Sequence, residues 1–151
     1  MVDDISLDEV IAVAEFRSAL RSFLRRTELI ARESGLTPQR YLLLLMIKGA
    51  PDRSERATLS ELVERLQLAE STVNELVART EKVGLLERHR DRDDHRLVEV
   101  RLTSEGERRL SLCVTALEPE RQRLRDAVEQ AALQHGSSRT KAQSDCAPGC
   151  P

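Results

Sequence analysis

Aromatic side chains are scarce in this sequence of 151 residues, which contains two Phe, one Tyr and no Trp. Leu, Val and Ala must therefore supply most of the apolar core. Small and straight-chain apolar residues favour helices, whereas strands are usually richer in aromatic residues. The composition thus predicts a mainly helical fold, and the length fits one domain, or one domain with an extension.

Long apolar runs and a basic N-terminal segment are also missing. The longest apolar run, residues 41–47, is far shorter than the ~20 residues that a membrane-spanning helix needs. Asp3, Asp4, Asp8 and Glu9 stand where a secretory signal peptide would carry basic residues. The three cysteines form an odd count and do not suggest a disulfide framework. We therefore expect a cytoplasmic protein with reduced thiols and no membrane partner.

Motifs for catalysis or cofactor binding are equally absent. The sequence contains no Ser/His/Asp arrangement, phosphate-binding glycine loop or paired carboxylate motif, so we expect neither an enzyme nor a cofactor. His135, Cys146 and Cys150 fall short of the four ligands of a closed zinc site, and no metal site is expected. A thiol or metal sensor built on the two tail cysteines is a weaker alternative. Cys113 lies in a helical pattern and is expected to be a small buried residue.

Charge of one sign does not dominate, since the formal net charge is −2. This value does not suggest a nucleic-acid-binding protein, but it does not exclude one. Charges separated by more than the Debye length, ~8–10 Å at physiological salt, hardly influence one another. A locally basic segment can therefore act within a mildly acidic chain.

Two helices are predicted before the centre of the chain. Ser6 and Glu9 have capping-box spacing, and apolar residues at helical spacing continue the pattern over residues 7–34. This long helix must bury its apolar face either within its own domain or, as we favour, against a second subunit. Thr37-Pro38 begins the next helix, which ends near Gly49 and is apolar almost all round, so it should be central and buried.

Residues 58–103 form the stretch around which the chain is organised. Thr58 and Glu61 give another capping box, followed by apolar residues at helical spacing, a turn at residues 67–70, and a second amphipathic stripe that ends at Gly84. Two short helices joined by such a turn make a helix-turn-helix. Residues 85–90 and 97–102 then alternate like strands around a polar tip, which predicts a β-hairpin wing.

The second helix of this unit would enter the major groove of DNA. Asparagine can bind adenine bidentately, hydroxyls can bond bases or phosphates, and Arg or Lys suits phosphates. Glu75 would repel phosphates unless it accepts from a cytosine amino group or is held by a neighbouring Arg. Taken alone, the helix fits an ordinary solvated face equally well. The outward-facing candidates are Ser71, Thr72, Asn74, Glu75, Arg79 and Lys82.

The wing strengthens the DNA-binding interpretation. Arg92, His95 and Arg96 lie on the narrow tip, where they could reach the minor groove or its phosphates. Asp94, two residues before Arg96, is placed to orient the Arg96 guanidinium. The alternative is a surface ion pair of little energetic value.

The C-terminal third begins with Thr103, which can cap a helix over residues 104–117. Pro119 either kinks that helix or opens a new one, because it lacks an amide proton. Helical spacing continues to residue 134. Residues 136–151 have no apolar periodicity and are predicted to be a disordered tail.

The segment EKVGLLER at residues 81–88, followed by Asp94-x-Arg96 and Leu102-Thr103, resembles the MarR family of bacterial transcriptional regulators. The resemblance extends from about residue 36 to residue 110. It implies a winged-helix homodimer, paired through its N- and C-terminal helices, that binds pseudo-palindromic double-stranded DNA. It also implies that Arg96 is the minor-groove arginine of the wing and Asp94 its orienting partner.

The same resemblance implies a repressor that responds to a small-molecule effector. The effector would bind a cleft near the first two helices, with Phe16, Phe23 and Tyr41 as candidate lining residues, although each also fits plain core. The sequence departs from the family pattern at two positions of the DNA-binding helix. Ala69 replaces the Ser that often caps the recognition helix, and Glu75 stands where a basic residue is common. Base preference therefore cannot be carried over.

The predicted fold is mainly α with a small antiparallel β-hairpin wing, that is, a winged helix-turn-helix. The expected parts are an N-terminal dimerisation helix (residues 1–36), the DNA-binding domain (37–103), C-terminal dimerisation helices (104–135) and the tail (136–151). The alternative function is a winged-helix protein-interaction module without sequence-specific DNA binding. Glu75 and the acidic net charge favour that alternative.

Overall fold

The computed structural model describes residues 5–144 of the chain, and their side chains as far as residue 133. It is mainly helical with one small antiparallel sheet, which confirms the predicted fold class. The chain divides into two compact units, one made of residues 1–26 and 118–151 and the other of residues 27–117. The elements in chain order are α1 (Leu7–Glu33), α2 (Pro38–Lys48), β1 (Arg56–Thr58), α3 (Leu59–Leu66), α4 (Glu70–Lys82), β2 (Leu86–Arg90), β3 (Val98–Leu102), α5 (Ser104–Ala116) and α6 (Glu118–Ser144).

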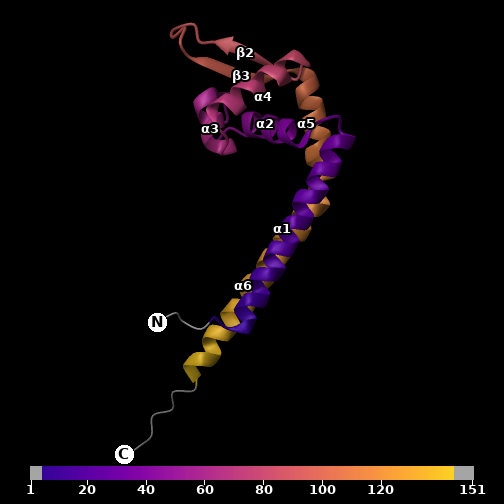
Figure 1. Ribbon diagram of the computed structural model, residues 1–151, viewed down its shortest axis with the longest axis vertical. Helices are drawn as coiled ribbons and strands as arrows, with labels where there is room; N and C mark the ends of the chain where they lie inside the picture. The colour runs from indigo at the N-terminus through magenta and orange to yellow at the C-terminus, as the bar shows by residue number, and fades with distance from the viewer. Residues whose placement is uncertain (1–4, 145–151) are drawn as a thin grey trace, which may run out of the picture. The chain divides into compact units, whose positions relative to one another are not determined.

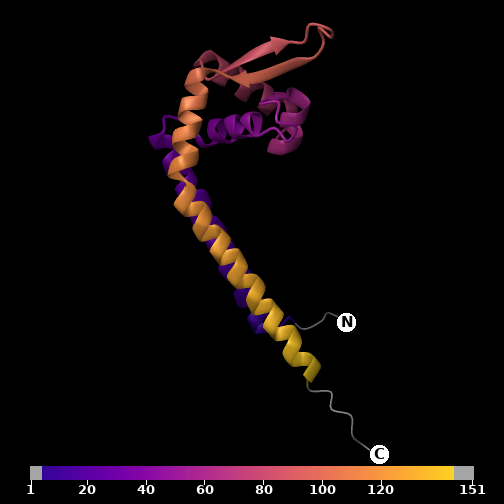
Figure 2. The same cartoon turned by 180° about the vertical axis from the view of Figure 1, so that it is seen from behind.

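In the first unit, α6 and the N-terminal part of α1 lie side by side (Figures 1 and 2). Glu120 joins them, because its carboxylate accepts from Arg26 Nε of α1 at 3.2 Å and from Arg123 of α6 at 2.8 Å. Much of the apolar surface of α1 nevertheless stays exposed. The exposed large apolar residues of α1 are Leu7, Val10, Ile11, Val13, Phe16 and Leu24.

Helix α6 differs from the expectation for the C-terminal region. Pro119 is its second residue, so the proline opens a new helix. The helix then continues to Ser144, past Gly136, where the disordered tail was expected to begin. Residues 136–144 are thus helical where the sequence analysis expected a disordered tail. A single interior glycine costs a helix only ~1 kcal/mol, and the residues that follow it include good helix formers such as Lys141 and Ala142. Residues 145–151 lie outside the described part of the chain.

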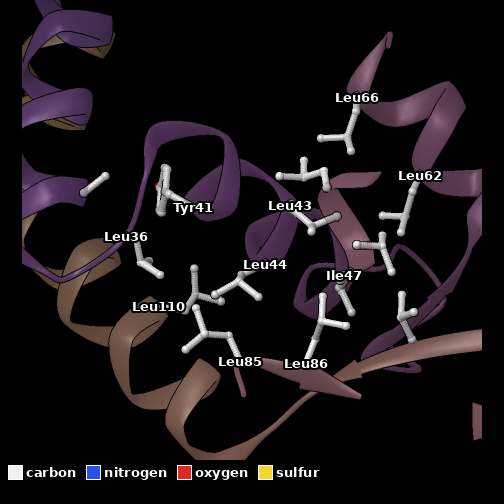
Figure 3. Close-up of a cluster of buried hydrophobic side chains, with 14 of the residues drawn as sticks. Leu36, Tyr41, Leu43, Leu44, Ile47, Leu62, Leu66, Leu85, Leu86 and Leu110 are labelled. Atoms are coloured by element: carbon white, nitrogen blue, oxygen red, sulfur yellow. The ribbon is translucent and has the colours of Figure 1, made fainter. Parts of the chain in front are cut away.

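The core of the second unit is built around α2, as its apolar sequence predicted. Leu43, Leu44 and Ile47 are completely buried, and the neighbouring elements contribute large apolar side chains around them (Figure 3). The contributing residues include Leu36, Leu62, Leu66, Val73, Val77, Leu85, Leu86, Val100 and Leu110. Cys113 and Leu117 of this cluster are also fully buried, so the expectation of a buried Cys113 is confirmed.

Side-chain caps define where α2 and α3 begin. Thr37 Oγ1 accepts from the Arg40 amide at 3.2 Å, and the predicted capping box of Thr58 and Glu61 is present in both directions. At the other end of α2, the Arg65 guanidinium of α3 donates to the carbonyls of Met46 and Gly49. A helix leaves its last carbonyls without intrahelical partners, so Arg65 both caps α2 and attaches α3 to it.

The sheet has three strands in the order β1-β3-β2, one more than predicted. The sequence indicated only the hairpin of β2 and β3. In the structure, Ala57 of β1 pairs with Val100 of β3 and is almost fully buried. Three residues are too few to show an alternating pattern, which is why this strand was missed. Figure 1 shows the β2–β3 hairpin extending beyond the helices of its unit.

Candidate nucleic-acid interface

Helix α4 has one buried face and one polar face. Val73, Leu76, Val77 and Thr80 are buried, as the helical stripe predicted. The single polar member of this face is satisfied, since Thr80 Oγ1 donates to the Leu76 carbonyl at 2.6 Å. Packing of this face fixes the helix in rotation and leaves the opposite face to solvent.

All six sequence-predicted contact residues of α4 lie outside its buried face. Asn74 is half-buried and the other five are exposed, namely Ser71, Thr72, Glu75, Arg79 and Lys82. The N-terminal end of the helix is unusual in one respect. Ala69 at the N-cap makes no side-chain hydrogen bond to the helix, as expected for alanine, while Glu70 in the first turn complements the helix dipole.

Glu75 and Arg79 form an ion pair on this exposed face, one turn apart, with Arg79 Nη2 donating to Glu75 Oε1. The side chains remain 60% and 68% exposed respectively. The sequence analysis gave two conditions under which Glu75 would not simply repel DNA: a cytosine amino group that donates to it, or a neighbouring arginine that holds it. The structure satisfies the second condition. The sequence identified both residues but gave no means of choosing between the two conditions.

Hydrogen bonds from the backbone order the tip of the wing. Asp91 Oδ1 accepts from the amides of Asp93 at 2.8 Å and Asp94 at 3.4 Å, and these bonds lower the pKa of the Asp91 carboxyl. The Asp91 amide in turn donates to the Leu97 carbonyl at 3.1 Å. Asp91 thus shapes the turn, a role that the sequence analysis did not assign to it. An Asp followed by polar residues between two strands is the signal that could have indicated it.

Asp94 does not make the contact that was predicted for it. Its Oδ1 accepts from the backbone amide of Arg96 at 3.0 Å, and no ion pair between its carboxylate and the Arg96 guanidinium occurs among the described residues. An aspartate two residues before an amide is well placed for this local bond. Asp94 therefore orients the backbone of Arg96, and the guanidinium stays exposed.

The wing exposes several cationic side chains, although residues 86–102 contain five arginines and five carboxylates. Arg92, His95 and Arg96 are exposed at or beside its tip, and within the part of the chain that the structure describes, Arg92 and Arg96 take part in no ion pair. Arg88 of β2 is different, because its Nε lies 3.0 Å from Glu81 Oε2 of α4 and so joins the wing to the helix. Arginines left exposed at a protruding tip can bind an anionic partner without first breaking an internal ion pair.

The three aromatic residues proposed to line an effector cleft belong to different units. Phe16 and Phe23 lie on α1 in the first unit, and Phe16 is 38% exposed. Tyr41 lies in the hydrophobic core of the second unit and is only 7% exposed. For Tyr41, this burial agrees with the plain-core alternative.

The sequence analysis expected neither a metal site nor a membrane-spanning helix. Among the side chains that the structure describes, there is no cluster of three or more His, Cys, Asp or Glu residues that could hold a metal ion. Cys146 and Cys150 lie outside the described residues, and so does the side chain of His135. Over the described residues 5–144, no helix combines the length and the apolar character needed to cross a membrane.

Comparison with known proteins gives a family match and a set of structural neighbours. Residues 34–97 match the model of the MarR family. No curated protein matches the sequence.

The structural neighbours have low sequence identity. AbsC, a MarR family transcriptional regulator from Streptomyces coelicolor, has a TM-score of 0.68 and 18% identity, covering 93% of this chain and 99% of its own. Wild-type MarR from E. coli has a TM-score of 0.64 and 21% identity, with 91% and 98% covered. A mutant of S. aureus MepR bound to an oligodeoxyribonucleotide has a TM-score of 0.61 and 20% identity, with 87% and 95% covered. At such identities these likenesses show a shared fold alone.

Proposed function

We propose that the protein is a DNA-binding transcriptional regulator of the MarR family, whose model residues 34–97 match. In this proposal α4 enters the major groove and the β2–β3 wing reaches the minor groove. The neighbouring structure of a MepR mutant bound to an oligodeoxyribonucleotide supports a DNA partner for this fold.

One observation carries the proposal. The same unit presents a polar helix face on α4 and, next to it in sequence, a projecting hairpin whose tip arginines Arg92 and Arg96 take part in no ion pair among the described residues. The Arg88–Glu81 ion pair between β2 and α4 helps to hold the two candidate DNA-contacting elements in one arrangement.

We further propose that the protein acts as a homodimer. The exposed apolar residues of α1 are close together in sequence, with five of the six between residues 7 and 16. A second copy is the occupant that the family resemblance implies, and covering this surface would remove it from water. Two recognition helices would then enter successive major grooves, ~34–36 Å apart, which requires a pseudo-palindromic operator.

The regulatory proposal is repression relieved by a small-molecule effector. It is supported by the family resemblance, in which many members repress and release DNA on binding a ligand. Phe16 and Phe23 are the described aromatic residues of the first unit that such a ligand could contact.

A titration of the full-length protein against a duplex from its own promoter region tests DNA binding. We expect the logarithm of the association constant to fall linearly with the logarithm of the salt concentration, because cationic side chains release counterions from the phosphates. A shuffled duplex of the same composition is the control and should bind more weakly. An equal affinity for both duplexes, or a flat salt response, would contradict the proposal.

The second candidate is a protein-interaction module, which the exposed Glu75 and the net charge of −2 favour. It predicts no specific complex with any duplex. Selection from a randomised duplex pool separates the two functions, because a pure interaction module would enrich no sequence.

A further inference from the structure

The Glu75–Arg79 ion pair occupies the position on α4 where base contacts are expected. Glu75 is the sixth residue of the helix and Arg79 the tenth. Side chains on a helix lean toward its N-terminus, and the bond to Glu75 directs the Arg79 guanidinium the same way. The N-terminal half of a recognition helix is the part that lies nearest to the base edges. The ion pair thus brings the Arg79 guanidinium from the C-terminal half of α4 toward the N-terminal half, which lies nearest to the bases.

As a source of stability the pair has little value. Exposed ion pairs four residues apart on a helix contribute only a few tenths of a kcal/mol, even with the glutamate first, as it is here. The pair is also poorly suited to binding a phosphate, because the Glu75 carboxylate offsets the positive charge of the Arg79 guanidinium. Lys82 lies on the same helix, is exposed, and takes part in no ion pair among the described residues, so it suits that purpose better.

Base reading is the task that the pair suits. Arginine binds the O6 and N7 atoms of guanine bidentately, and this contact needs a fixed guanidinium plane more than it needs net charge. A free arginine loses considerable rotamer freedom when it binds, and a carboxylate that already holds Nη2 reduces that loss. The remaining N–H groups of the guanidinium stay available, since the Arg79 side chain is 68% exposed.

We propose that Glu75 and Arg79 together read one G·C base pair in each half-site, with Arg79 binding the guanine and Glu75 acting as its positioning residue. The inference rests on the proposed DNA-binding function and names the base pair that this part of the surface recognises. It also accounts for an acidic residue on a surface that faces DNA. The carboxylate is tolerated there because the guanidinium neutralises it and needs it for orientation.

The experiment uses the full-length chain and a pool of randomised duplexes. Wild-type protein should enrich a G·C pair at one position of each half-site. Replacing that pair by A·T in an otherwise identical duplex should weaken binding about tenfold or more. Arg79→Lys should keep the charge but lose this preference. Glu75→Gln and Glu75→Ala should reduce the preference while leaving binding to random duplex equal or stronger, because a negative charge is removed.

A matched control is Glu64→Gln, which removes the same charge from an exposed position of α3. It should leave the G·C preference intact. Both α4 positions are exposed, so the variants should fold normally, which thermal unfolding can verify.

The outcomes distinguish this inference from the function on which it rests. If wild-type protein enriches no duplex at low salt, the proposed function fails, and the inference fails with it. If a site is enriched but the Glu75 and Arg79 variants keep the wild-type base preference, only the inference is overturned. A loss of affinity in Arg79→Lys that is uniform across all sequences would likewise overturn it, because that is the behaviour of a phosphate contact.

Discussion

The hydroxyl of Thr103 donates a 2.6 Å hydrogen bond to the carbonyl of Gly84 and accepts a 3.1 Å bond from the amide of Gly106. The Thr103 amide also donates to the Leu85 carbonyl at 3.1 Å. Thr103 follows β3, Gly84 and Leu85 precede β2, and Gly106 lies in the first turn of α5. One residue therefore closes the base of the wing and starts the helix after it. This is a physical reason for a threonine at the end of the Leu102-Thr103 motif.

Replacing Thr103 with Val keeps the shape of the side chain and removes both hydroxyl bonds. The lost N-cap and the lost bond to Gly84 should together lower the free energy of unfolding by about 1–2 kcal/mol. Urea unfolding of the variant measures this change. Thr115→Val, on the exposed side of α5, is the matched control and should change stability by less than about 0.5 kcal/mol. Equal effects of the two substitutions would contradict the role assigned to Thr103.

Gly106 should not tolerate even a methyl group. A Cβ built there would lie 2.0 Å from the Leu85 carbonyl oxygen, which belongs to the backbone and cannot move independently. Helix propensity alone would favour Ala by ~1 kcal/mol, but the steric overlap should win. We expect Gly106→Ala to lower the free energy of unfolding by about 1–3 kcal/mol. Denaturant unfolding measures it, with Ser111→Ala on the exposed side of α5 as the control. A stabilised Gly106→Ala variant would show that α5 does not approach the Leu85 carbonyl this closely.

The sequence predicted those elements that local signals define. The capping box of Thr58 and Glu61, the Thr37-Pro38 helix start and the apolar stripe of α4 each act within a few residues, and the structure contains all of them. The strand β1 was missed because its pairing with β3 is a long-range contact that three residues cannot encode in a pattern.

The sequence predicted which residues belong to the candidate interface, but not which hydrogen bonds and ion pairs they make. The exposed residues of α4 and the wing tip follow from helical and strand periodicity. Which partner each one takes depends on side-chain conformations that spacing does not determine. Asp94 was expected to bind the Arg96 guanidinium and instead accepts from the Arg96 amide, while Glu75 proved to have Arg79 as its partner.

Acid should weaken the contact between α5 and the residues before α2. The pKa of Glu105 is lowered to about 2 by hydrogen bonds from Arg108 and Arg109, and Arg109 also donates to the Gly35 carbonyl at 2.8 Å. A carboxyl group whose folded-state pKa is depressed stabilises the fold above its unfolded-state pKa, and this stabilisation is lost as the pH falls toward the folded-state value. The window is therefore from about pH 4.5 down to about pH 2.

Glu105→Gln tests this expectation. Wild-type protein should lose more stability than the variant between about pH 5 and pH 2.5. Over that range the Glu105 carboxylate binds a proton in the unfolded state while the folded state keeps it ionised, and the variant has no such group. Urea midpoints at the two pH values give the comparison. Glu64→Gln, at an exposed position of α3 for which no ion pair is described, serves as the control and should leave the pH dependence of wild type unchanged. Parallel pH profiles for wild type and Glu105→Gln would contradict the assignment.

Arg96→Ala tests the wing. The Arg96 guanidinium is exposed and takes part in no ion pair among the described residues, so its removal should not destabilise the fold. If it reaches the minor groove, where the potential is most negative, affinity for the promoter duplex should fall at least about tenfold. The slope of the logarithm of the association constant against the logarithm of the salt concentration should also become less steep, by about one released counterion per bound wing. Arg125→Ala on α6 removes the same charge from the other unit and should leave both quantities near their wild-type values. If Arg96→Ala binds as tightly as wild type, the wing does not contact DNA through this residue, and α4 alone must account for any binding.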